Sequence, residues 1–209
     1  MRIGVIGGTF DPIHLGHLIA AEEVRSTLKL QKVLFVPAGE PPHKKHQAVS
    51  PAFHRVKMVE LSIATNPFFE LSLVDVNRPG SSYTVDTLEI LRKELGESVE
   101  LFFIIGMDSL AEIPTWKNPE RLIAQARLVV VNRPPYPTVD LTSLEEKLPG
   151  ISSRVDMVPI PGIYIASSDL QERVANCRPI KYQVMESVEN YIRENRLYLA
   201  KPGRSPYKK

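Results

Sequence analysis

The sequence has little cysteine and no long apolar run, and each shortage excludes a class of protein. Cys177 is the one cysteine among 209 residues, so no intramolecular disulfide can form and a reducing cytoplasm is expected. The longest apolar runs, 101–105 and 128–131, fall far short of the roughly 20 residues that span a bilayer. The start, Met1-Arg2-Ile3, also lacks the pattern of a signal peptide. No association with a membrane is expected.

The chain also lacks an excess of one charge. Lys and Arg together number 26 and Asp and Glu 24, which gives a net charge of +2 and a pI near 8.6. A dedicated nucleic-acid binder would carry a clear basic excess, so no nucleic-acid partner is expected, whereas small anionic substrates stay compatible. The length predicts one domain over 1–200, followed by a disordered basic tail at 201–209.

Short apolar runs alternate with helical patterns. Strands are predicted at 3–6, 33–36, 71–74, 101–105, 128–131 and 155–160. Helices are predicted at 15–28, from Ser50-Pro51 to Asn66-Pro67, at 84–95, 169–175 and 186–195, with 134–150 weakly ordered. Parallel strands need crossover connections, so the alternation predicts an α/β fold, a doubly wound and mostly parallel sheet with helices on both faces.

The segment GGTFDPIHLGH, at 7–17, carries the clearest chemistry. Gly7 and Gly8 follow the first strand directly, where backbone without side chains can approach a phosphate. His14 and His17 lie three residues apart in the first helical turn, where N–H groups and the helix dipole already favour an anion. The chain has neither the GK[ST] ending of a P-loop nor a GxGxxG fingerprint. The segment therefore predicts a phosphate site of another kind.

Two other interpretations of this segment stay open on the residues alone. The glycine pair is a tight turn in one of them, and the histidines are ordinary surface or core residues. In the other, Asp11, His14 and His17 hold a divalent ion. No further cluster of His, Cys and carboxylate occurs at ligand spacing, so no protein-bound metal is expected.

Taken with four further segments, this motif resembles the HxGH nucleotidyltransferase superfamily, in the form found in bacterial nicotinate-nucleotide adenylyltransferases. PPHK at 41–44, RPGSSYTVDTL at 78–88 and FIIGMDSLAEIPTW at 103–116 are similar to segments of that family. Tyr191-Ile192 and Leu197-Tyr198 match its C-terminal pattern. The resemblance runs in order from Arg2 to Tyr198.

The resemblance implies a Rossmann-like fold and adenylyl transfer from ATP to nicotinate mononucleotide, giving deamido-NAD and pyrophosphate in NAD biosynthesis. It implies that His14 and His17 stabilise charge in the reaction and that Mg²⁺ is carried with ATP. The residues implied to bind ATP are Gly7, Gly8, Thr9, Phe10, Lys44, Gly106, Asp108, Ser167, Ser168 and Arg173. Those implied to bind the mononucleotide are Tyr83 and Thr84, at a helix start, and Trp116, which would stack on the pyridine ring.

Several of these residues have a plainer interpretation. Lys44 can be part of a solvated charge run, and Asp108 can be a helix N-cap. Trp116, between Pro114 and Pro119, is predicted in a loop at the sheet edge, and its alternative is a core anchor. Arg55 is interpreted as decorating the exposed face of its helix.

The clearest departure from the family lies at 165–171, where IASSDLQ stands in place of the usual ISSTxIR. Gln171 thus replaces an arginine, which removes a positive charge from the phosphate side. Ser167 and Ser168 are predicted to cap a helix starting near Asp169. The hypothesis is that Arg173 or Lys44 compensates; the alternative is weaker ATP binding or a changed substrate.

Two other functions are compatible with the sequence. One is a same-fold adenylyltransferase with another acceptor, nicotinamide mononucleotide or phosphopantetheine. The other is a non-catalytic nucleotide-binding regulator, motivated by the missing arginine. A homo-oligomer is compatible with the sequence.

Overall fold

The computed structural model describes residues 1–42, 48–96, 98–132 and 140–199, built around one sheet. All pairings in this sheet are parallel, and the strand order is β3-β2-β1-β4-β5-β6. The strands are β1 (Arg2–Gly8), β2 (Lys32–Pro37), β3 (Phe69–Leu71), β4 (Glu100–Gly106), β5 (Ala126–Asn132) and β6 (Val155–Pro159). The predicted α/β fold with a parallel sheet is confirmed. The tail predicted at 201–209 lies outside the described residues.

The strands are apolar on both faces because each face covers its own core. In β5, Val129 and Val131 pack into one core while Leu128 and Val130 pack into the other. Successive side chains of a strand point to opposite faces, so a strand buried on both sides is a continuous apolar run. The runs in the sequence therefore become the central strands of the sheet.

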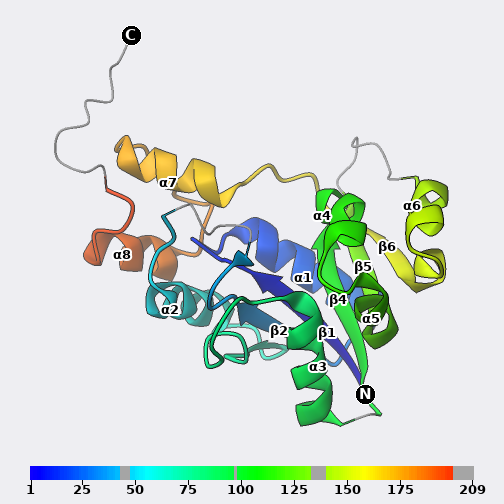
Figure 1. The fold of residues 1–209 in the computed structure, drawn as a ribbon. Helices are drawn as coiled ribbons and strands as arrows, with labels where there is room; N and C mark the ends of the chain where they lie inside the picture. The colour runs from blue at the N-terminus through cyan, green and yellow to red at the C-terminus, as the bar shows by residue number, and fades with distance from the viewer. Residues whose placement is uncertain (43–47, 97, 133–139, 200–209) are drawn as a thin grey trace.

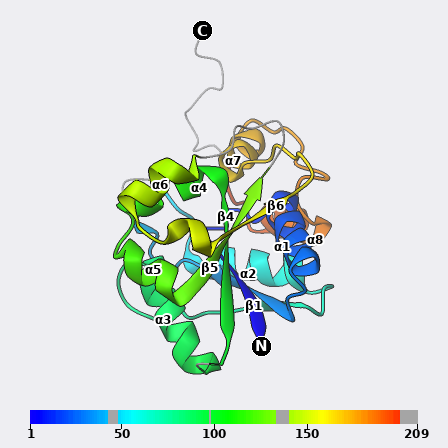
Figure 2. The same cartoon turned by 90° about the vertical axis from the view of Figure 1, so that its right-hand side faces the viewer.

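Helices cover both faces of the sheet (Figure 1). Turned by 90°, the molecule shows α1, α2 and α8 on one side and α3, α5 and α6 on the other (Figure 2). The first core includes side chains from α1 (Leu15–Thr27), α2 (Ala52–Ile63), α7 (Ser167–Ala175) and α8 (Glu186–Glu194). The second includes side chains from α3 (Thr84–Leu95), α4 (Met107–Glu112), α5 (Pro119–Gln125) and α6 (Leu141–Lys147).

Three parts of the predicted secondary structure are wrong. The third strand lies at 69–71, not 71–74: Phe69 pairs with Val33, and the chain turns after Leu71. Helix α6 occupies 141–147 inside the stretch predicted to be weakly ordered, capped by Asp140, whose carboxylate accepts the Thr142 N–H at 2.9 Å. Short helices α4 and α5, and the 3-10 turns at 113–115 and 151–154, were not predicted.

None of the helices in the described parts of the chain combines the length and apolar character needed to cross a membrane.

Candidate active site

The strand order places a cavity beyond the carboxyl ends of the central strands. Strands are added toward one edge of the sheet from β1 to β3 and toward the other edge from β4 to β6, and ligands of such sheets bind where this order switches, between β1 and β4. Gly7 and Gly8 end β1, Gly106 ends β4, and all three line a cavity of about 450 Å³. The glycine pair at which the sequence predicts a phosphate site therefore lines a cavity.

His14 and His17 lie together at the N-terminus of α1, and both line the cavity. Their rings stack, with centroids 3.7 Å apart. The His17 Nδ1 accepts the backbone N–H of His14 at 3.2 Å. An accepting Nδ1 carries no proton, so the neutral His17 ring has its N–H at Nε2. The donor group of this ring is therefore Nε2–H.

Two neighbours set the positions of these rings. The rings of Phe10 and His17 meet edge to face, with centroids 5.2 Å apart. Phe10 is buried in the core and does not line the cavity. At Gly16, an added β-carbon would lie 3.0 Å from Nδ1 of His14. The glycine of the motif therefore leaves room for the His14 ring.

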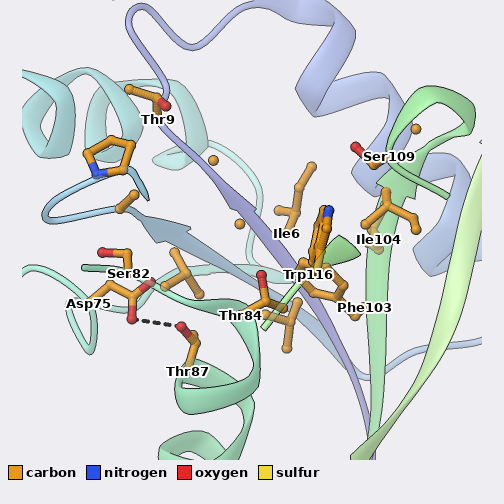
Figure 3. Close-up of a pocket in the computed structure, with 18 of the residues that line it drawn as sticks. Ile6, Thr9, Asp75, Ser82, Thr84, Thr87, Phe103, Ile104, Ser109 and Trp116 are labelled. Carbon is orange, nitrogen blue, oxygen red and sulfur yellow. Dashed lines mark hydrogen bonds between the residues drawn. The ribbon is translucent and has the colours of Figure 1, made fainter. Parts of the chain in front are cut away.

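Trp116 also lines the cavity, with Phe103 beside it (Figure 3). The two rings meet edge to face, with centroids 6.3 Å apart, and Trp116 is half-buried against the second core. It follows the 3-10 turn Ile113–Thr115, outside any helix. The indole thus packs on the core, as the alternative interpretation expected, and also lines the cavity. Its stacking on a pyridine ring stays a prediction.

Tyr83 and Thr84 also line the cavity, at the start of α3. The Tyr83 N–H already donates to the Ser81 carbonyl at 3.0 Å. The first residues of a helix have no acceptor one turn earlier, so the donors offered there belong to Thr84 and Val85. The helix start can therefore bind a carboxylate, with the donors one residue further along than predicted.

A buried polar cluster, not predicted from the sequence, supports the start of α3. The Asp75 carboxylate accepts from Arg78 Nε at 2.8 Å and from Thr87 Oγ1 at 2.7 Å, the latter drawn in Figure 3. Arg78 Nη1 also donates to the Ser81 carbonyl at 3.0 Å. These residues lie in or beside the RPGSSYTVDTL segment, and that segment was the only sign of the cluster in the sequence.

Gly39 follows β2 and packs against the backbone of Asp75, a member of this cluster. Replacing Gly39 with alanine is expected to destabilise the protein. An added β-carbon would lie 2.3 Å from the Asp75 carbonyl oxygen, so one backbone segment has to move. Overpacking of this kind costs roughly 1 to 3 kcal/mol, which urea unfolding can measure. In the control, Gly7→Ala, the β-carbon would only touch the Phe103 ring at 3.6 Å. Equal unfolding midpoints for the two variants would contradict the expectation.

Arg55 corrects one prediction. The interpretation as an exposed helix residue is wrong, because Arg55 is only 2% exposed. Its guanidinium donates to four backbone carbonyl oxygens: those of Thr9 (2.9 Å), Ala38 (2.7 Å), Gly39 (3.1 Å) and Ser50 (2.9 Å). Burial lowers the pKa of Arg55, and the nearby Asp11 acts in the opposite direction. Arg55 therefore ties the segments after β1 and β2 to the start of α2.

Asp11 is buried beside this cluster. Its Oδ1 accepts the Tyr198 hydroxyl at 2.6 Å, and its Oδ2 accepts the Ser50 N–H at 2.9 Å. Burial, followed by the charge of Asp11, raises the pKa of Tyr198, so the hydroxyl keeps its proton. Among the described residues no group of three or more His, Cys, Asp and Glu side chains is placed to hold a metal ion. The carboxylate of Asp11 is engaged in fixing the chain.

The other residues implied to bind ATP lie at varying distances from the cavity. Thr9 lines it. Asp108 is exposed at the second residue of α4 and does not line it. The N-cap of α4 is Gly106, so the alternative of Asp108 as an N-cap is wrong. Lys44 lies outside the described residues.

The residues of α7 make contacts of a different kind from those predicted. The helix starts at Ser167 with Ala166 as its N-cap and no side-chain cap, so the predicted capping by Ser167 and Ser168 is wrong. Ser167 Oγ instead donates to the Pro12 carbonyl at 2.9 Å. Arg173 Nε donates to the Pro179 carbonyl at 3.0 Å. Ser167, Ser168 and Arg173 do not line the cavity.

Comparisons with known proteins agree with one another. The model of the cytidylyltransferase-like family matches residues 5–173. A probable nicotinate-nucleotide adenylyltransferase of Thermomicrobium roseum is 49% identical over 197 residues, 94% of this chain and 91% of that protein. One from Moorella thermoacetica is 45% identical over 201 residues, again 94% and 91%. The fold is similar to that of Plasmodium falciparum nicotinic acid mononucleotide adenylyltransferase complexed with NaAD, with a TM-score of 0.76, 20% identity and coverage of 94% and 97%.

Proposed function

Since the chain belongs to the cytidylyltransferase-like family and, within it, to the nicotinate-nucleotide adenylyltransferases, we propose that it joins ATP to nicotinate mononucleotide. The products are nicotinate adenine dinucleotide and pyrophosphate, in the biosynthesis of NAD. The family assignment from the motifs is confirmed. The observation that supports the activity best is the stacked pair His14 and His17, at the start of α1, in a cavity that Trp116 also lines.

The transfer needs little covalent chemistry from the protein. An oxygen of the mononucleotide phosphate attacks the α-phosphorus of ATP, and the bond between that phosphorus and the bridging oxygen of pyrophosphate breaks. The attacking phosphate is already anionic and needs no general base, so alignment and charge stabilisation dominate. His14 and His17 are proposed to stabilise the α-phosphate oxygens, with His17 donating through Nε2–H.

The cavity has one part suited to each substrate. Gly7, Gly8 and Gly106 end β1 and β4, and we assign this end to ATP. Trp116 and the start of α3 also line the cavity, and we assign this part to the mononucleotide. An indole face can stack on a pyridine ring, while the helix start donates to its carboxylate.

Mg²⁺ is proposed to enter as part of the MgATP substrate. The absence of a ligand cluster among the residues described above supports this, because an ion without protein carboxylates is held by the phosphates. The cytoplasm is the proposed compartment, in keeping with ATP as substrate and a lone cysteine.

Pyrophosphate release tests the proposal. The protein is incubated with ATP and Mg²⁺ in three parallel reactions, with nicotinate mononucleotide, nicotinamide mononucleotide or phosphopantetheine as acceptor. Release is expected with nicotinate mononucleotide. Release with phosphopantetheine alone would assign a different acceptor, and no release with any acceptor would leave a nucleotide-binding regulator.

The positive charge missing at Gln171 is proposed to come from Lys44, with Arg173 as the alternative. Arg173 donates to the Pro179 carbonyl, so Arg173→Ala is expected to leave the KM for ATP within about twofold of the original value. Lys44→Ala is expected to raise it about tenfold or more, the effect of one charged hydrogen bond. Steady-state kinetics at varied ATP measure both. A rise only in the Arg173 variant would reverse the assignment.

A further inference from the structure

The segment that carries the two histidines is held from the far end of the chain. Four hydrogen bonds reach residues 11–15 from residues 167–198. They are Tyr198 OH to Asp11 Oδ1 (2.6 Å), Gln171 Nε2 to the Asp11 carbonyl (2.6 Å), Ser167 Oγ to the Pro12 carbonyl (2.9 Å) and the Leu15 N–H to the Gln183 carbonyl (2.9 Å). The first three bonds end on the residues that lead directly into His14.

We propose that Tyr198 and Gln171 are positioning residues, which fix His14 and His17 for adenylyl transfer by holding Asp11. Neither side chain lines the cavity, so neither is assigned a contact with substrate. The inference rests on the proposed function for its kinetic consequence, and on the contacts at Asp11 for its structural one.

The backbone before Asp11 needs such support. Phe10 has a φ of 52°, in the left-handed region that is unfavourable for a bulky residue. A conformation of this kind persists only where the surroundings determine it. Phe10 is buried in the first core, and the next residue is held at its carboxylate and at its carbonyl. The histidines therefore follow a segment whose conformation depends on outside contacts.

The burial of Asp11 makes the Tyr198 hydroxyl important. Asp11 is 2% exposed, and a buried carboxylate is costly unless donors surround it. Tyr198 supplies the donor to Oδ1 and the Ser50 N–H supplies the donor to Oδ2. Without the hydroxyl, Oδ1 has to turn toward another donor or toward water. Either movement displaces the chain that leads to His14.

Gln171 fits the same role. The family pattern that this segment resembles has arginine at this position, and the resemblance places that arginine on the phosphate side. The shorter amide of Gln171 reaches the Asp11 carbonyl at 2.6 Å and is half-buried. Its neutral N–H satisfies a carbonyl without placing a charge beside the buried carboxylate. The departure from the family pattern thus adds a fixing contact where a phosphate ligand was expected.

The variant Tyr198→Phe tests the proposal, with Tyr191→Phe as its matched control. Tyr191 also joins the C-terminal region to α2, through its hydroxyl and His54 Nδ1 at 2.9 Å, but it does not contact Asp11. Pyrophosphate release is expected to show a kcat about tenfold lower in Tyr198→Phe, with the KM for nicotinate mononucleotide unchanged. The control is expected to keep its kcat. A Tyr198→Phe protein with the kcat of the control would overturn the proposal.

A second measurement does not depend on activity. With ¹⁵N-labelled histidine, Tyr198→Phe is expected to shift the ring signals of His14 and His17, while Tyr191→Phe shifts that of His54. If the unaltered protein releases no pyrophosphate, the proposed function fails, and these signals alone test the inference. Unchanged His14 and His17 signals in Tyr198→Phe would then overturn it.

Discussion

Replacing His17 with alanine is expected to lower kcat by about a hundredfold or more without unfolding the protein. Removal of one donor to a developing oxyanion costs about 2.7 to 4 kcal/mol of transition-state stabilisation. His17 offers such a donor at Nε2, because its Nδ1 accepts the His14 N–H. The side chain is only half-buried, so its loss leaves no large void. Pyrophosphate release at saturating substrates measures the effect.

His54→Ala is the matched control. This histidine lies on α2, is partly buried like His17, and does not line the cavity. Its replacement is expected to leave kcat within about twofold of the original value. A His17→Ala protein that keeps near-normal turnover would remove His17 from the reaction.

Arg55→Met is expected to be the most destabilising of the substitutions considered. Methionine fills much of the same space but donates nothing, so four backbone carbonyls lose a donor at once. Each buried group left unsatisfied costs about 1 to 3 kcal/mol. With water reaching some of them, we expect the free energy of unfolding to fall by about 3 kcal/mol or more. Urea unfolding followed by circular dichroism measures this.

Two further variants define what Arg55 contributes. Arg121→Met removes an arginine whose side chain is 59% exposed and paired with Glu89, and should cost at most about 1 kcal/mol. Arg55→Lys keeps the charge but lacks the planar fork that bonds several carbonyls, so it should resemble Arg55→Met. If Arg55→Lys is as stable as the original protein, charge and not hydrogen bonding accounts for the effect.

Hydrophobic patterns in the sequence predicted most strands of the sheet but not the short helices of the protein. The central strands are apolar runs that stay buried on both faces, as at Leu128–Val131. Helix α4, Met107–Glu112, has six residues and α5, Pro119–Gln125, has seven. Fewer than two turns cannot show a repeated apolar stripe, and such helices depend on packing more than on their own propensity. They were therefore missed.

Arg55 shows why the supports of the site were harder to predict than its motif. The prediction placed Arg55 on the exposed face of its helix. The buried face of α2 instead includes Arg55, together with Met58 and Val59. The carbonyls that make its burial favourable belong to segments near residues 9, 38 and 50. Only the assembled sheet brings them together, so no local pattern shows them.

The motif itself was informative because its parts are close in sequence. Gly7, Gly8, His14 and His17 need one strand, one turn and one helical turn to meet at the cavity. The hydroxyl of Tyr198 is 187 residues away from Asp11. The sequence placed Tyr198 in a family pattern but gave no reason for its presence there.

That separation also sets an order of events during synthesis. The histidine segment leaves the ribosome well before the hydroxyl that holds Asp11, because Tyr198 follows Asp11 by 187 residues. The sheet can pair β1 with β4 as soon as residue 106 has emerged. A nascent chain can therefore be largely folded while its histidines are not yet fixed. Tyr198 is added about 90 residues after the central strands can pair. Synthesis proceeds at about 5 to 20 residues per second, so the contact that fixes the histidines forms seconds after that pairing.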